Sequence, residues 1–123
     1  MPKHEQTWVK VNTHVDAGVL GIVSALSLFP TLQTIESCQG DGEKAAWVCF
    51  SFGPYWQSSW KETAAFVLGF LAPKLFEKVG DSIRLSLRPR QCGDVLVDLT
   101  VRAGALMDTE RALVEIAQDF NSC

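Results

Sequence analysis

The strongest constraint on this fold comes from two alternating segments in the second half of the chain. Every second residue is apolar from Ser82 to Arg88, beginning at Ile83, and again from Val95 to Val101. Successive side chains of a β-strand point to opposite faces, so this spacing places the apolar side chains on one face. Antiparallel sheets that bury one face show this pattern. The sequence therefore predicts two half-buried antiparallel strands.

Three earlier segments also have strand-like patterns. Thr7–Asn12 alternates, with Val9 and Val11 on one face. Gln33–Cys38 and Ala45–Phe52 follow as a second and a third strand, and the polar residues 39–44 between them are typical of a hairpin turn. Five strands are expected in all.

The clearest helix start is at Ser59, because Glu62 follows three residues later and completes a capping box. Gly80 ends this helix. Pro73 lies inside it and predicts a kink, since proline cannot donate a hydrogen bond to the carbonyl of Gly69. The apolar stripe expected on this helix consists of Trp60, Ala64, Val67, Leu68, Leu71, Leu75 and Val79.

Two more helices are expected, one near each end of the chain. Asp16 is the expected N-cap of the first, which ends at Phe29–Pro30. Asp108 is the expected N-cap of the last. Its expected buried face consists of Leu113, Ile116, Ala117 and Phe120.

A chain of 123 residues is long enough for one hydrophobic core and too short for two ordinary domains. We therefore expect a single two-layer α+β domain over residues 1–123. Its sheet has five mostly antiparallel strands, with three helices on one face. The first six elements match the ferredoxin-like βαββαβ arrangement, and one strand and one helix are added after it.

Composition excludes several classes of function. The formal net charge is −3 and the pI is about 5.3, which gives no overall attraction to nucleic acid or to anionic membranes. The longest apolar runs are shorter than the roughly 20 residues that cross a bilayer, and the first residues lack the pattern of a signal peptide. We therefore expect a cytoplasmic protein without a membrane partner.

The cysteine pattern favours reduced thiols. Cys38, Cys49, Cys92 and Cys123 are far apart and form no C-x-x-C pair. Cys38 and Cys92 are expected at opposite ends of the domain, so no metal site is predicted. The sequence also lacks the phosphate-loop, dinucleotide, nucleophile-elbow and zinc-protease motifs. We assign no catalytic residue from such motifs and predict no cofactor from them.

Polar residues are expected to gather at one end of the domain, around Cys38. A short link joins the first helix to the second strand, so the two run antiparallel and the helix start lies near the strand end. Helix N-termini there would favour an anion or a thiolate, although a small cysteine at a hairpin corner is also often inert. The candidate binding residues are His14, Asp16, Glu36, Ser37, Cys38, Gln39, Gly40 and Asp41.

The sheet face opposite the helices is a candidate interface. Trp47 and Cys49 point away from the apolar face of their strand, toward the side that the helices leave open. Aromatic and arginine side chains on an open sheet can stack single-stranded bases, but the chain is acidic and lacks the RNA-recognition motifs. We therefore expect a homodimer or higher oligomer through this face. The candidate interface residues are Trp8, Trp47, Cys49, Arg84, Arg88 and Arg102.

The segment from Val15 to Gly40 resembles the start of the wybutosine-synthesis tRNA methyltransferase family. In that family a helix after an aspartate leads to a strand that ends in Thr-Thr-Ser-Ser-Cys-Ser-Gly-Arg, and here the strand ends in Thr34-Ile-Glu-Ser-Cys-Gln-Gly40. The resemblance implies S-adenosylmethionine and modification of a tRNA purine, with Ser37, Cys38 and Gly40 in the matching loop. Glu36 and Gln39 replace two of the family's serines, and Asp41 replaces its arginine.

Three functional hypotheses follow from the sequence. The first is a self-associating protein that binds a small ligand or partner at the polar site around Cys38. The second is a thiol-dependent or methyltransferase-like enzyme that acts on a nucleotide or a tRNA base, with Cys38 as nucleophile and His14 as base. The third is an oligomer with a purely structural role.

Overall fold

The computed structural model describes residues 6–8, 14–16, 19–38, 45–53, 59–90 and 94–122. The candidate binding residues Gln39, Gly40 and Asp41 lie outside these ranges. So do Cys92 and Cys123, and most of the strand predicted at Thr7–Asn12. In the described part of the chain, no helix is long and apolar enough to cross a membrane.

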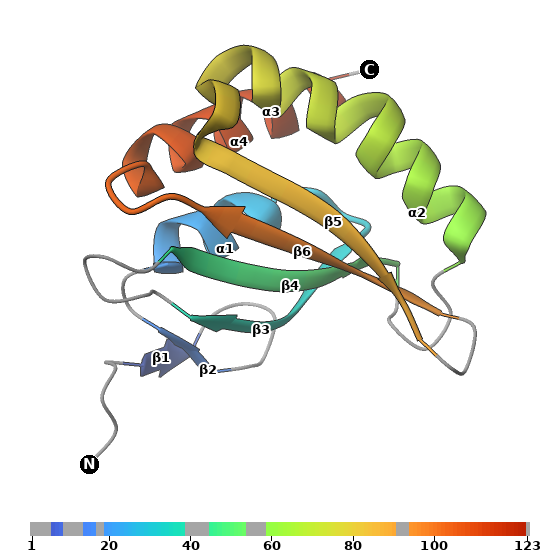
Figure 1. Ribbon diagram of the computed structural model, residues 1–123, viewed down its shortest axis with the longest axis horizontal. Helices are drawn as coiled ribbons and strands as arrows, with labels where there is room; N and C mark the ends of the chain where they lie inside the picture. The colour runs from blue at the N-terminus through green and yellow to red at the C-terminus, as the bar shows by residue number, and fades with distance from the viewer. Residues whose placement is uncertain are drawn as a thin grey trace.

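The centre of the fold is a four-stranded antiparallel sheet (Figure 1). Its strands are β3 (Leu32–Cys38), β4 (Ala46–Phe52), β5 (Ile83–Pro89) and β6 (Val95–Val101). They lie in the order β3-β4-β6-β5, so that β4 and β6 pair at the centre and join two hairpins. All four strands predicted in these segments are confirmed.

The start of the chain differs from the prediction. β1 (Gln6–Trp8) pairs with β2 (His14–Asp16) in a separate two-stranded sheet. The main sheet therefore has four strands and not five, and the ferredoxin-like arrangement is not confirmed. Because Asp16 pairs with Gln6 as part of a strand, it is not the N-cap of the first helix. That helix, α1 (Leu20–Leu26), has the apolar Val19 at its N-cap position instead.

The helix predicted between Ser59 and Gly80 contains a π turn. It consists of α2 (Trp60–Phe66), the π turn η2 (Val67–Leu71) and α3 (Ala72–Val79), and the short 3-10 turn η3 (Gly80–Ser82) follows it. Ser59 caps its start, because its hydroxyl accepts a hydrogen bond from the Glu62 N–H at 3.2 Å. Gly80 ends it with a φ of +61°, a conformation that glycine adopts readily.

The π turn lies where the kink was predicted. The Ala72 N–H donates to the carbonyl of Val67, five residues back, immediately before Pro73. An α-helix would need a proline N–H to satisfy the carbonyl of Gly69, and proline has none. A π turn shifts the hydrogen-bond pattern by one residue at this point, which is a known way to accommodate such a break.

The π turn also changes which residues are buried. One extra residue in the helix rotates everything before it relative to everything after it. Val67, Leu71 and Leu75 are buried as predicted, but before the turn the buried positions are Thr63 and Phe66. Trp60 and Leu68, which were expected in the stripe, are 52% and 59% exposed, so this part of the prediction is wrong.

The last helix, α4 (Leu106–Asn121), begins slightly earlier than predicted. Ala105 occupies the N-cap position, and Asp108 lies in the first turn, where a carboxylate still interacts favourably with the helix dipole. Leu113, Ile116 and Ala117 are buried as predicted, and Phe120 is partly buried against the core.

The core lies between the helices and one face of the sheet. Figure 1 shows α2, α3 and α4 arching over this face, with α1 behind the central strands. A cluster of rings, in which neighbouring centroids lie 4.6–5.8 Å apart, fills one end of the core. Its members are Phe29, Phe52, Phe66, Phe70 and Phe120. The sheet's other face carries most of the polar side chains.

Candidate functional site

Strand pairing aligns candidate residues that were predicted at two separate sites, a binding site and an interface. Cys38 of β3 lies opposite Trp47 of β4, Trp47 lies opposite Thr100 of β6, and Thr100 lies opposite Arg84 of β5. These four residues form one row across the sheet, on the face away from the helices. The predicted binding residue Cys38 and the predicted interface residues Trp47 and Arg84 therefore belong to one surface.

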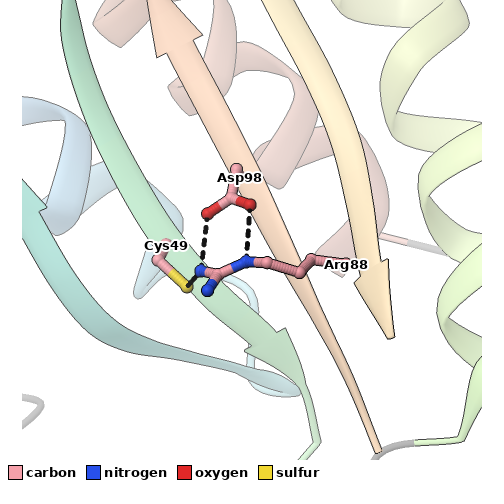
Figure 2. Close-up of polar contacts among 3 residues, drawn as sticks. All are labelled: Cys49, Arg88 and Asp98. Atoms are coloured by element: carbon pink, nitrogen blue, oxygen red, sulfur yellow. Dashed lines mark hydrogen bonds and ion pairs between the residues drawn. The ribbon is translucent and has the colours of Figure 1, made fainter. Parts of the chain in front are cut away.

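A second row lies next to the first on the same face. It runs from Glu36 through Cys49 and Asp98 to Ser86. The Arg88 guanidinium reaches over this row from β5 (Figure 2). Its Nε lies 3.0 Å from Asp98 Oδ2 and its Nη2 lies 3.0 Å from Asp98 Oδ1, so the ion pair is bidentate. The same Nη2 lies 3.3 Å from the Cys49 Sγ.

The Cys49 thiol is unsuited to act as a nucleophile. Cys49 has no exposed surface, and burial raises the pKa of its thiol to about 11. The negative charge of Asp98 also raises this pKa, whereas the positive charge of Arg88 lowers it. Nucleophilic cysteines need the thiolate form at neutral pH. Cys49 is therefore a buried part of the face and is not accessible for contact with a partner.

A hollow lies beside the first row, where the edge strand β5 meets the end of β6. Its volume is about 670 Å³, and Arg84, Thr100, Arg102, Ser82 and Asp81 are among its lining residues. The backbone N–H of Arg102 donates to the backbone carbonyl of Ser82 at 2.8 Å, which holds the two chain segments together. Volumes of about 300–1,000 Å³ are usual for small-molecule sites.

The two arginines of the hollow differ from their neighbours in their pairing. Arg88 and Arg90 form ion pairs with Asp98 and Asp94. Arg84 and Arg102 are exposed, and neither has an ion-pair partner among the residues that the structure describes. Their guanidinium groups are therefore available to bind an anion.

The remaining candidate binding residues lie in different surroundings. Ser37 pairs with Val48, on the helix side of β3, where its hydroxyl is buried with no hydrogen-bond partner in the described structure. His14 and Asp16 lie in β2, which contacts β3. The structure thus gathers Glu36 and Cys38 with Trp47, Cys49, Arg84 and Arg88, and it turns Ser37 to the other side.

Sequence reasoning missed Asp98 and Thr100. Both are the polar residues of an otherwise apolar strand, and both face the open side. The sequence did offer a signal, because Asp98 is a charged residue in a half-buried strand. Its partner Arg88 could be identified only from the pairing of β5 with β6. Arg88 lies opposite Leu96, so Arg88 and Asp98 meet along a diagonal.

The described ranges contain no group of three or more histidine, cysteine, aspartate or glutamate side chains placed to hold a metal ion.

The chain matches no known protein family model, and comparison with curated proteins and with solved structures finds no match either. The resemblance to the wybutosine-synthesis family therefore stays a prediction.

Proposed function

We propose that this protein is a small-ligand binding domain and that its ligand carries an anionic group. The observation that carries the proposal is the pair Arg84 and Arg102, two exposed guanidinium groups that line one hollow of about 670 Å³ and have no ion-pair partner among the described residues. Guanidinium groups bind carboxylates and phosphates through two parallel hydrogen bonds. The hydroxyls of Ser82 and Thr100 line the same hollow and add neutral donors.

The row that contains Cys38 suggests a second feature of the ligand. Trp47 lies two strands away from Arg84, with Thr100 between them. Neighbouring strands are about 4.8 Å apart, so the indole and the guanidinium begin roughly 10 Å from each other. A ligand that has a planar group and an anionic group at this separation can contact both. Nucleotides and aromatic carboxylates have this size and chemistry.

In this proposal the polar site expected around Cys38 extends along the whole row from Cys38 to Arg84. Cys38 is half-buried at one end of it. In this arrangement its thiol lines the planar end of the ligand site and performs no chemistry. The proposal therefore differs from the enzymatic hypothesis, in which Cys38 is the nucleophile.

A titration with adenosine 5′-monophosphate, followed by the amide signals of the ¹⁵N-labelled protein, tests the proposal. We expect chemical shift changes at Arg84, Thr100 and Arg102, with smaller changes at Trp47. The double variant Arg84→Gln, Arg102→Gln should weaken binding at least tenfold, since each charge-assisted hydrogen bond contributes about 1.5–3 kcal/mol. Inorganic phosphate should bind more weakly at the same arginines.

Arg111→Gln is the matched control. Arg111 is also an exposed arginine, but it lies on α4, where its Nη1 is 4.0 Å from Asp108 Oδ1. Its replacement removes one positive charge outside the hollow and should leave binding unchanged. An equal loss in the control, or shift changes that avoid the β5–β6 end of the sheet, would contradict the proposed site.

The rate of alkylation of Cys38 by iodoacetamide, measured against pH, tests the enzymatic hypothesis separately. A nucleophilic Cys38 should react at its full rate well below pH 8. A rate that follows the titration of an ordinary thiol would remove the main support for that hypothesis.

A further inference from the structure

The outer surface of the helix α2-η2-α3 exposes large apolar side chains. Trp60, Leu68 and Phe76 are 52%, 59% and 45% exposed. They are spaced eight residues apart along the helix that arches over the sheet in Figure 1. Eight residues of α-helix make about 2.2 turns, so successive members would be displaced around the axis. The wider π turn between Val67 and Leu71 reduces this displacement.

We propose that this helical face binds a second copy of the chain, with the two helices antiparallel. We call it the α2–α3 face and define it by Trp60, Lys61, Leu68, Phe76 and Glu77. Leu68 and Gly69 lie at its centre, and both are exposed. The face borders the proposed ligand site, because Phe76 also lines the hollow that contains Arg84 and Arg102.

The charges on this face are complementary to themselves. Lys61 and Glu77 are both exposed and lie at equal distances in sequence from Gly69, on opposite sides of it. In an antiparallel pair with its twofold axis near Gly69, Lys61 of one chain meets the partner's Glu77, and this contact occurs twice. A parallel pair would bring Lys61 against the partner's Lys61, which is unfavourable.

The apolar residues are centred on Leu68, one residue before Gly69, so nearly the same twofold arrangement pairs them. Trp60 and Phe76 are equally far from Leu68, so each ring meets the other kind of ring across the axis while Leu68 meets its own copy. Lysines and glutamates are balanced along the whole face, so it has no net attraction to an anionic membrane surface.

The size of the face indicates a weak dimer. Its three large side chains expose roughly 300 Å² together. Stable interfaces bury about 800 Å² on each partner. We therefore expect a dimer that dissociates reversibly, with Kd in the range from about 10 µM to about 1 mM.

This face is better suited to self-association than the sheet face predicted from the sequence. On the sheet face, Cys49, Ser51 and Leu96 are already buried within the chain, and Arg88 is paired with Asp98. On the α2–α3 face, the large apolar side chains of Trp60, Leu68 and Phe76 are exposed. A partner gains more by covering them, because the buried apolar area determines the hydrophobic free energy.

Sedimentation velocity between about 10 µM and about 1 mM protein tests this proposal. The average mass should rise toward that of a dimer with concentration, and Leu68→Lys should keep the protein monomeric over the whole range. The matched control is Met107→Lys, which adds the same charge at a residue that is 75% exposed on α4. It should dimerise like the original chain. A monomer at every concentration, or dimers that persist in Leu68→Lys, would overturn the proposal.

Exchanging the charges tests the antiparallel geometry. Lys61→Glu and Glu77→Lys should each weaken the dimer about fivefold, because two ion pairs become two repulsive pairs. The double variant Lys61→Glu, Glu77→Lys restores both pairs, so its Kd should return to within about twofold of the original value. If the double variant is as weak as the single ones, the antiparallel arrangement is wrong. Circular dichroism of every variant verifies that the fold is unchanged.

Discussion

The Arg88 guanidinium connects three strands, because it pairs with Asp98 of β6 and lies against the Cys49 thiol of β4. The two contacts act on Cys49 in opposite directions. Asp98 raises the pKa of the thiol and Arg88 lowers it, and burial adds the largest upward shift. The thiol therefore keeps its proton to about pH 11 in the folded chain, above its ordinary value of 9.0.

The raised pKa of Cys49 predicts a loss of stability at alkaline pH. Below pH 9 the folded and the unfolded chain both hold the proton, so the contribution is complete. Between pH 9.0 and about 11 the unfolded chain loses its proton first, and the free energy of unfolding falls by an amount on the order of 2 kcal/mol. Guanidinium chloride unfolding at several pH values measures this loss.

Two variants determine whether this loss comes from Cys49. Cys49→Ala should be less stable at neutral pH and should lack this part of the alkaline loss. Cys38→Ala removes a thiol that lies in the neighbouring row and is half-buried, and it should keep the loss. An unchanged pH dependence in Cys49→Ala would contradict the assignment.

Asp98→Asn should lower the pKa of the Cys49 thiol. The change removes the negative charge that raises this pKa and leaves the Arg88 charge that lowers it. Arg88→Met should have the opposite effect on the same pKa. The ultraviolet absorbance of the thiolate, titrated in both variants, measures the two shifts, and shifts of the same sign would show that Asp98 and Arg88 do not control the thiol.

Two buried hydroxyls predict stabilising substitutions. Thr63 and Thr109 have no exposed surface, and their Oγ1 atoms have no hydrogen-bond partner within the described ranges. A buried polar group without a partner costs about 1–3 kcal/mol. Thr109→Val keeps the shape and removes the hydroxyl, so the free energy of unfolding should rise by about 1 kcal/mol.

Ser51 is the matched contrast for this prediction. It is equally buried, but its hydroxyl donates to the Gly53 carbonyl at 2.7 Å. Ser51→Ala should therefore lower the free energy of unfolding by about 1 kcal/mol. If both substitutions destabilise the protein, the Thr109 hydroxyl has a partner in solution.

Among the helices, the segment from Ser59 to Gly80 shows best how local signals and packing differ. Its ends could be predicted because the Ser59 cap and the Gly80 conformation are local. The π turn could not, since proline in a helix is compatible with a kink, a break or a π turn. Which one occurs depends on the surfaces that the two halves of the helix must bury.

The rotation produced by the π turn predicts a large difference between two aromatic residues. Phe66 is 6% exposed and its ring packs against Phe29 and Phe52, whereas Trp60 is 52% exposed. Phe66→Ala should cost about 3–5 kcal/mol of unfolding free energy, and Trp60→Ala less than about 1 kcal/mol. Chemical denaturation compares them. A larger loss for Trp60→Ala would favour the apolar stripe predicted from the sequence.

Considered as one unit, the chain consists of two hairpins that share a single core. β3 and β4 form one, β5 and β6 form the other, and the β4–β6 pairing joins them beneath the helices. Side chains from both hairpins and from α1, α3 and α4 belong to one cluster, including Leu26, Leu75 and Leu113. Neither hairpin can bury its apolar face alone.

This shared core predicts one cooperative unfolding transition for the whole chain. Far-ultraviolet circular dichroism reports the helices, and tryptophan fluorescence reports Trp47 and the other indoles. The two curves should have the same midpoint in guanidinium chloride. Two separate midpoints would mean that the hairpins unfold as independent domains, against the single domain expected from 123 residues.

Local physical chemistry was sufficient to predict most of the elements from the sequence. The alternation in β5 and β6, the cap at Ser59 and the positive φ at Gly80 depend on residues close in the chain. The place of the first strand in the main sheet and the Asp16 cap were wrong, because β1 pairs with β2 in a separate sheet and that pairing includes Asp16. The residues of the candidate site were predicted as two separate groups, because only the pairing of β3, β4, β6 and β5 aligns them.

Only the tertiary structure decided which side chains meet. Cys38, Trp47, Thr100 and Arg84 come from four strands, and their alignment depends on strand order and pairing, which no local pattern encodes. A shift of one residue in the pairing register of a strand would have turned its side chains to the opposite face of the sheet, toward the helices. Local periodicity determines which residues can be buried, whereas the pairing of distant strands determines which neighbours they have, because those contacts depend on the packing of the entire core.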